Sequence, residues 1–282
     1  MSSLGALSHP LQEQSFVAFD TETTGIWAPA HRIVEIAAVK FRLGGGPEVS
    51  FQTLVNPLRK IPHEVIEIHG ITNEMVADAP EAPAALQQFL AFCGTDSILV
   101  AHNAIFDISF VACELERAQM IRPPAVILDT IDIFQRLHPE LESYSLLSVA
   151  SALGIAQVQE HRALADAELV RQLMLHAAPK LPPMSTAEEL SRHFTVFSFD
   201  HWQENEVELP AEFAALQTAI VAGKRVRLEY RTPSQDPSIR IIQPRQVYGL
   251  GSRVYIYGFC ERSHEDRTFR LDRIITFEVL DD

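Results

Sequence analysis

Cysteine and long apolar runs are both scarce in this chain. Its 282 residues include 3 cysteines, Cys93, Cys113 and Cys260, which lie far apart and form no Cys-x-x-Cys pair. We therefore expect neither a disulfide framework nor a zinc–thiolate site, and the thiols fit a reducing cytoplasm. No apolar run approaches the roughly 18–20 residues that a membrane span needs. The first sixteen residues show no cationic segment followed by an apolar one, so we expect no secretory signal, no membrane partner and a cytoplasmic location.

Positive charge is also in short supply. The chain has 23 Lys+Arg against 37 Asp+Glu, a formal net charge of -14, and so strongly acidic a protein should be repelled by nucleic acids. The acid is unevenly spread: residues 1–178 hold 10 basic and 21 acidic side chains, whereas residues 220–282 hold 11 and 9. Ten of those eleven cations are arginine, the side chain that pairs with phosphate and stacks on aromatic rings.

Length and proline content predict two domains. The prolines of residues 179–183 (PKLPP) break any helix that enters this segment. We predict a first domain over residues 1–178, a partly packed linker over 179–208 and a second domain over 209–282.

The first domain opens with strands and continues with alternating strands and helices. Short apolar runs separated by Gly and Pro residues predict strands at 15–20, 32–41 and 48–55. Further strands are predicted at 97–101 and 126–128, with helices at 82–93, 107–118, 130–137, 146–153 and 162–176. This order predicts an α/β fold in which a mixed sheet is flanked by helices.

Two carboxylates stand at the end of the first predicted strand. Asp20 and Glu22 are two residues apart, so alternation places both on one face, about 6–7 Å apart along the strand. Carboxylates this close repel each other unless a cation neutralises them or one takes a proton. Oxygen ligands alone favour Mg²⁺ or Mn²⁺ over Zn²⁺. The alternative is an acidic turn at a strand end.

Two further segments combine histidine with aspartate. The segment HNAIFD, residues 102–107, lies at a predicted strand-to-helix junction, where ligand sites of α/β folds gather, although Asp107 could simply cap the helix. In HRALADA, residues 161–167, His161 and Asp166 would differ by about 140° around a helix. We therefore expect His161 on the preceding loop and Asp166 on the buried side of the helix. The alternative is an alanine-rich packing helix with a capping histidine.

In this order the three segments resemble the motifs of the DEDDh family of 3'-5' exonucleases, the superfamily of the proofreading subunit of bacterial replicative DNA polymerase. FDTETTG at 19–25 resembles the first motif, HNAIFD the second and HRALADA the histidine-containing third. The resemblance covers about residues 12–178 and implies an RNase H-like fold. It implies two Mg²⁺ or Mn²⁺ ions held by Asp20, Glu22, Asp107 and Asp166.

The resemblance also implies a role for each nearby side chain. His161 would be the general base that activates water for attack on the 3'-terminal phosphodiester, releasing 5'-mononucleotides. Such a base typically contributes about 10²–10⁴-fold in rate. Thr21, Glu64 and His69 would lie near the terminal nucleotide.

Several substrates and partners remain open. The motifs fit single-stranded DNA 3' ends, but they do not choose the sugar, so an exoribonuclease or oligoribonuclease is an alternative, as is a non-catalytic nucleic-acid sensor. No polymerase motif is present, so proofreading would need a replication or repair partner. The sequence QQFLAF at residues 87–92 fits a sliding-clamp-binding pattern, but it lies in a predicted apolar helix and is expected to pack instead.

The C-terminal segment reads as a small β-barrel. After a predicted helix at 211–222, short strands are predicted at 226–230, 239–242, 253–258, 268–271 and 274–280. RTFRLDRI at 267–274, together with Tyr255, resembles the WYL domain, which implies an Sm-like barrel, although Val254 and Ile256 replace the Trp and Leu of the name.

Aromatic and guanidinium groups mix in this segment. Stacking of bases and neutralisation of phosphates would suit Tyr255, Arg267, Arg270 and Arg273, so we expect nucleic-acid binding or ligand sensing there. The alternative is that the arginines pair with nearby acids such as Asp272 and the barrel serves folding or partner docking.

Overall fold

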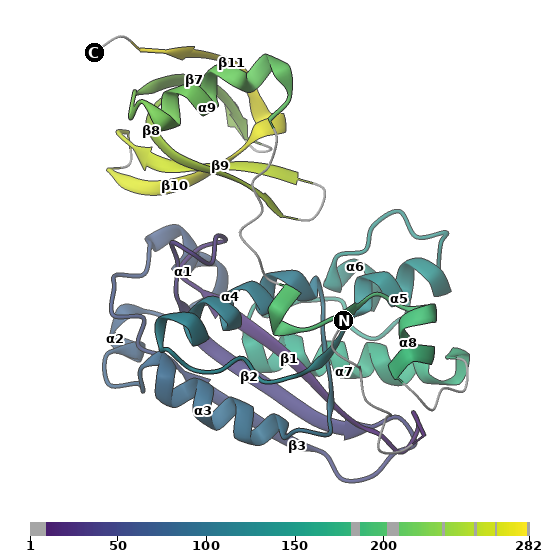
Figure 1. Ribbon diagram of the computed structural model, residues 1–282. Coiled ribbons are helices and arrows are strands. Elements are labelled where there is room, and N and C mark those ends of the chain that lie inside the picture. The colour runs from purple at the N-terminus through teal and green to yellow at the C-terminus, as the bar shows by residue number, and fades with distance from the viewer. Residues whose placement is uncertain are drawn as a thin grey trace. The chain divides into compact units, whose positions relative to one another are not determined.

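The structure is a computed structural model that describes residues 10–181, 187–201, 209–232, 235–250, 253–262 and 264–280. The chain divides into two compact units, Met1–Trp202 and Gln203–Asp282 (Figure 1). Each unit is described by itself. The domain limits expected from the sequence stay a prediction.

A six-stranded mixed sheet forms the centre of the first unit. Its strands are β1 (Ser15–Thr23), β2 (Ile33–Arg42), β3 (Val49–Leu54), β4 (Ile98–Ala101), β5 (Val126–Asp129) and β6 (Val196–Phe197), in the order β3-β2-β1-β4-β5-β6. β1 pairs parallel to β4, and β4 parallel to β5, while the other pairings are antiparallel. The predicted mixed sheet is confirmed, and β6 is an addition that the sequence pattern did not reveal.

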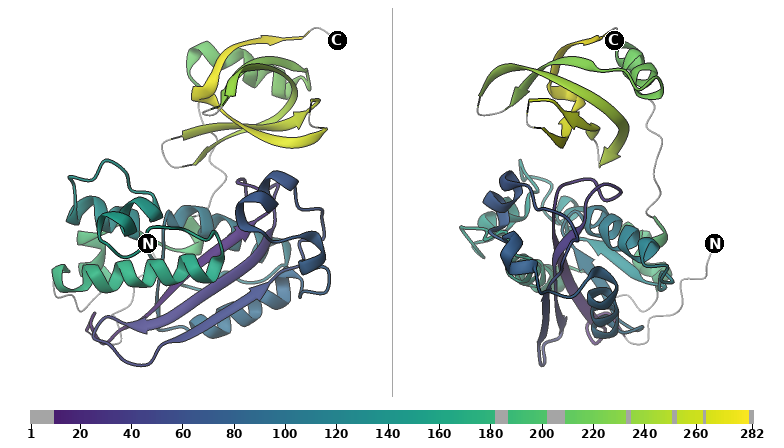
Figure 2. Two further views of the ribbon diagram at one scale, coloured as in Figure 1. Left: turned by 180° about the vertical axis from the view of Figure 1, so that it is seen from behind. Right: turned by 90° about the vertical axis from the view of Figure 1, so that its left-hand side faces the viewer.

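Helices cover both faces of this sheet (Figure 2). One face packs against α3 (Ala82–Cys93) and α4 (Ala104–Arg117), and the other against α5 (Thr130–Leu137), α6 (Leu146–Ala152), α7 (Ala163–Ala177) and α8 (Ala187–His193). Alternation along β1 divides the core accordingly: Val17 and Phe19 belong to the first cluster, Phe16 and Ala18 to the second.

Shorter segments complete the first unit. α1 (His63–His69) and α2 (Asn73–Val76) follow β3, and Ile71 and Val76 pack against Val34 of β2. The short 3-10 helices η1 (Ala178–Lys180) and η2 (Phe199–His201) flank α8 and β6. Leu190 and Phe194 are buried in the hydrophobic cluster that also contains the apolar residues of α7. This part of the expected linker therefore packs onto the first unit.

The cysteines, the segment 87–92 and the apolar character of the helices can now be described from the structure. All three cysteines are buried, and none of them takes part in a disulfide. Residues 87–92 lie in α3, where Phe89 is buried and Leu90 and Phe92 pack beside it, which confirms the packing interpretation. Among the described residues, no helix has the length and apolar character that crossing a membrane requires.

The second unit is a five-stranded antiparallel sheet that curls around one core (Figure 2). It comprises η3 (Ala211–Phe213), α9 (Ala214–Val221), β7 (Val226–Thr232), β8 (Gln235–Leu250), β9 (Arg253–Cys260), β10 (Glu265–Arg270), η4 (Leu271–Arg273) and β11 (Ile274–Val279), with strand order β10-β9-β8-β7-β11. β8 is far longer than the strand predicted at 239–242, because its first half pairs with β7 and its second half with β9. The strand predicted at 268–271 ends one residue early, since Leu271 starts η4.

Candidate metal-binding active site

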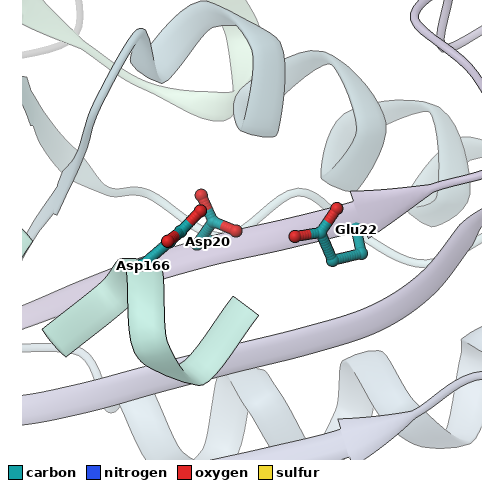
Figure 3. A group of neighbouring side chains, drawn as sticks. All are labelled: Asp20, Glu22 and Asp166. Atoms are coloured by element: carbon teal, nitrogen blue, oxygen red, sulfur yellow. The ribbon is translucent and has the colours of Figure 1, made fainter. Parts of the chain in front are cut away.

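Three carboxylates from two elements meet at the end of β1. Asp20 and Glu22 project from one face of the strand, and Asp166 comes from the first turn of α7 (Figure 3). Each offers a ligand oxygen, and these oxygens all lie within 4.8 Å of one another. α7 packs directly on β1 and β2, and its Ala163 and Ala167 are fully buried, which lets the helix approach the sheet closely.

Asp107 approaches these three carboxylates from the other face of the sheet. It is buried in the first turn of α4, and its Oδ1 accepts hydrogen bonds from the Thr21 main-chain N (2.9 Å) and Oγ1 (2.7 Å). The alternative that Asp107 caps the helix is wrong, because α4 begins at Ala104 after Asn103 in a left-handed conformation (φ 61°). Asp107 is tied to β1 between Asp20 and Glu22 instead.

The carboxylates strongly perturb one another. Burial raises the pKa of Asp20 well above its usual value, and the charges of Asp107 and Glu22 raise it further. Burial, and then the charge of Asp166, raises the pKa of Glu22 to about 9. Burial also raises the pKa of Asp107 to about 7, although the hydrogen bonds from Thr21 oppose the shift. Such a cluster holds protons at neutral pH unless a cation replaces them.

The donor set fits a divalent cation. Asp166 Oδ2 accepts a hydrogen bond from Gln159 Nε2 at 2.6 Å, whereas its Oδ1 is buried and has no hydrogen-bond partner. Leaving a buried anionic oxygen without a donor is costly, and a cation bound beside it removes that cost. A ligand set made only of carboxylate oxygens is the kind that Mg²⁺ and Mn²⁺ prefer.

His161 stands beside this cluster on an exposed loop. It directly precedes Arg162, the N-cap residue of α7, as the helical geometry predicted. Its φ of 50° lies in the left-handed region, which is uncommon for residues other than glycine. Strained backbone of this kind persists where the surrounding structure holds it, and it gathers at functional sites.

An ion pair between the buried Glu35 and the half-buried Arg162 adjoins the cluster and was missed by sequence reasoning. Glu35 lies on β2 directly opposite Glu22 in the strand register and is fully buried. Burial alone would raise its pKa, but hydrogen bonds from Arg162 and Gln52 hold the pKa of Glu35 below its usual value. The available signal was a single charged residue inside an apolar strand, IVEIAAV.

A half-buried carboxylate, Asp129, fixes the loop of the second motif. Asp129 accepts hydrogen bonds from the main-chain N of Asn103 and of Ala104, both at 3.0 Å. His102 contacts Thr130 Oγ1 and the Tyr144 carbonyl oxygen, each at 2.8 Å, and burial lowers its pKa to about 4. His102 is thus a neutral structural residue that shapes the entry to α4.

The residues expected near a terminal nucleotide lie on two elements. His69 is buried at the end of α1, where its Nδ1 accepts a hydrogen bond from Ile71 N (3.0 Å) and its buried Nε2 has no hydrogen-bond partner. Burial lowers the pKa of His69, so the ring is neutral. Glu64 is half-buried on α1, and Thr21 is engaged with Asp107. Their contact with substrate stays a prediction.

The expected binding residues of the second unit differ in exposure. Tyr255 is buried on β9, while Arg267, Arg270 and Arg273 are half-exposed. Arg270 forms a bidentate pair with Asp272, at 3.0 and 2.5 Å, as the alternative interpretation anticipated. Nucleic-acid contact through these side chains stays a prediction.

Comparison with known families matches both units. Residues 17–174 match the RNase_T family, described as exonuclease, and residues 211–279 match the WYL domain. The chain belongs to the exonuclease family. The resemblance inferred from the three motifs is confirmed. The fold of this family implies divalent metal ions, and the acidic cluster provides ligands for them.

Similar proteins include much longer polymerases. The DNA polymerase III PolC-type protein of Oceanobacillus iheyensis is 36% identical over 195 residues, which are 69% of this chain but 13% of that protein. Its Thermotoga maritima counterpart is 38% identical over 163 residues, 58% of this chain and 12% of that protein. The chain therefore spans only about an eighth of the length of these relatives.

Solved exonucleases share the fold. The nuclease domain of 3'hExo, a DEDDh family member bound to rAMP, superposes with a TM-score of 0.54 at 17% identity, covering 61% of this chain and 97% of that chain. Exonuclease I gives a TM-score of 0.53 at 15% identity, covering 88% and 55%. The RNase H-like architecture of the first unit agrees with these neighbours.

Proposed function

We propose that this exonuclease-family protein is a metal-dependent 3'-5' exonuclease. It would hydrolyse the 3'-terminal phosphodiester of mainly single-stranded DNA and release 5'-mononucleotides. The observation that carries the proposal is the cluster of Asp20, Glu22 and Asp166, with ligand oxygens within 4.8 Å and an unpartnered buried oxygen on Asp166. Together with Asp107, these residues would hold two Mg²⁺ or Mn²⁺ ions.

The chain's own residues would divide the remaining work. When bound, the ions stabilise negative charge on the attacking and leaving oxygens. His161 removes the proton of the attacking water, and its exposed ring then returns that proton to solvent. The two hydrogen bonds from Thr21 keep the Asp107 carboxylate turned toward β1. His69, at the end of α1, would lie near the terminal nucleotide.

The nature of the nucleic acid is the finer part of the proposal. DNA is favoured because relatives that are 36–38% identical to this chain are DNA polymerases, whereas the 3'hExo neighbour was solved with a ribonucleotide, which keeps RNA as the alternative. The two differ in the 2'-hydroxyl that the site must accept or reject. Proofreading or repair would require a polymerase or other protein partner, and a cytoplasmic location fits cysteines that form no disulfide.

The WYL domain would assist substrate binding or sense a ligand. Arg267, Arg270 and Arg273 supply cations in the only segment of the chain that is not acidic, although Asp272 already neutralises one of them. A non-catalytic sensor on a nuclease fold is the competing function. It is disfavoured because the four carboxylates and the histidine of the motifs are all present.

One experiment tests the activity directly. Full-length protein is incubated with 3'-labelled single- and double-stranded DNA and RNA in Mg²⁺, Mn²⁺ or EDTA, and products are separated by chromatography. We expect 5'-mononucleotides only with metal, and no activity from Asp20→Asn, while the exposed control Asp78→Asn behaves as wild type. Intact substrates under every condition, or an active Asp20→Asn, would refute the proposal.

A further inference from the structure

The start of α7 is capped by a carboxylate from another element. Arg162, the N-cap residue, makes no side-chain capping hydrogen bond. Instead, Glu35 Oε2 accepts a hydrogen bond from the main-chain N of Ala163, at 3.0 Å. The first amide groups of a helix have no partner within it and favour a negative charge. A residue of β2 therefore performs the task of a helix cap from 128 positions earlier in the chain.

Both oxygens of Glu35 are fully used by protein donors. Oε1 accepts from Arg162 Nη2 (2.6 Å) and Gln52 Nε2 (2.8 Å), and Oε2 accepts from Arg162 Nε (3.1 Å) in addition to the helix amide. This fork-to-fork arrangement fixes orientation as well as distance. Although Glu35 lies opposite Glu22, its oxygens are therefore not available to a metal, in contrast to Asp166, whose buried Oδ1 has no partner.

Arg162 lies between two groups that the proposed chemistry needs. His161 precedes it in a left-handed conformation, φ 50°. The Arg162 carbonyl oxygen accepts the hydrogen bond of Asp166 N at 3.0 Å, in the first turn of α7. A shift of the Arg162 main chain therefore displaces both His161 and Asp166.

We propose that Glu35 and Arg162 form a positioning pair. The pair holds the His161 loop and the first turn of α7 in a fixed position relative to the carboxylates of β1. The inference rests on the proposed function, in which His161 moves a proton. Displacement of a reacting group by about 1 Å can cost about 100-fold in rate. Because neither residue of the pair is expected to touch substrate, its loss lowers kcat and leaves KM nearly unchanged.

Conservative substitutions of both residues, with a matched control on α7, test the pair. Arg162→Lys keeps the positive charge but loses the fork, and Glu35→Gln keeps the shape but loses the charge. The control is Arg171→Lys, since Arg171 is also on α7 and also makes two hydrogen bonds to a carboxylate, Glu168, at 2.8 and 2.5 Å. We expect kcat to fall by about 30- to 100-fold in the first two variants, with KM within about threefold, and no change in the control.

Hydrogen–deuterium exchange of full-length protein provides a readout that does not depend on activity. Peptides covering residues 159–166 should exchange at least about fivefold faster in Glu35→Gln and Arg162→Lys than in wild type or Arg171→Lys. If wild type degrades no nucleic acid, the proposed function fails, and the exchange rates alone decide the positioning pair.

Two results would overturn the inference. One is a folded variant of the pair with kcat within twofold of wild type. The other is unchanged exchange across residues 159–166. If Glu35→Gln does not fold, Arg162→Lys decides, because the Arg162 side chain is 34% exposed and tolerates replacement better than the fully buried Glu35.

Discussion

Glu22→Gln should stabilise the metal-free protein, and increasingly so at higher pH. Burial and the charge of Asp166 raise the pKa of Glu22 from 4.5 to about 9. Above pH 4.5 the unfolded chain gives up this proton while the folded chain keeps it. Glu22 therefore costs the wild-type protein no stability below about pH 4.5, and it lowers the free energy of unfolding progressively as pH rises toward 9. Glutamine has no proton to lose, so the variant escapes this penalty.

The size of the effect follows from the same shift. At pH 7 the wild type is about 2.5 pH units above the unfolded pKa, and each unit corresponds to about 1.4 kcal/mol, which gives about 3.5 kcal/mol. Solvent reaches part of the Glu22 side chain, so screening reduces this to about 2 kcal/mol. For a unit of this size, that corresponds to a rise in Tm of roughly 4–8 °C.

Thermal unfolding from pH 4.5 to 9 checks this prediction. In EDTA, the Tm of Glu22→Gln minus that of wild type should be near zero at pH 4.5 and grow steadily to pH 9. With Mn²⁺ this Tm difference should become smaller or change sign, because the ion stabilises the wild-type protein by binding the carboxylates of its folded state. Glu67→Gln, whose parent side chain is 68% exposed on α1, should show no such trend. A flat or falling difference curve in EDTA would refute the electrostatic reasoning.

Three more outcomes are expected. His161→Gln should lower kcat by about 10²–10⁴-fold while calorimetric Mn²⁺ binding stays at the wild-type level, since His161 is not among the clustered ligands. Phe89→Ala should lower the free energy of unfolding of the first unit by about 3–5 kcal/mol in urea titrations, because the fully buried ring leaves a cavity. Removal of residues 209–282 should raise KM far more than it lowers kcat on single-stranded DNA, and equal effects on both would contradict a binding role for the WYL domain.

The sequence was most informative where the relevant geometry is local. Strand alternation predicted that Asp20 and Glu22 share a face, and the turn of a helix predicted that His161 and Asp166 separate between loop and helix. Both relations depend only on the repeat of the backbone over a few residues. The structure accordingly has both arrangements.

Long-range contacts set what the sequence could not predict. The alternative role of Asp107 as a helix cap is wrong, because the start of α4 is fixed by Asp129, more than twenty positions later, through two main-chain hydrogen bonds. In the sequence, Glu35 is a single charged residue in an apolar strand, and its partner Arg162 lies 127 positions away. No periodicity of either segment encodes the partner, so only tertiary structure reveals these two carboxylates as supports for the site.

The acidic composition and the proposed substrate are compatible once the charges are placed. Asp20, Glu22, Asp107 and Asp166 carry as many negative charges as two divalent ions carry positive ones, so a loaded site does not repel a phosphate by its own charge. Glu35 is neutralised by Arg162 and adds no net charge beside it. The remaining acids act from a distance, and at physiological ionic strength charges more than about 8 Å away are largely screened. The net charge of -14 therefore supplies no long-range attraction for nucleic acid, and the arginine-rich segment after residue 220 becomes the part of the chain able to supply it.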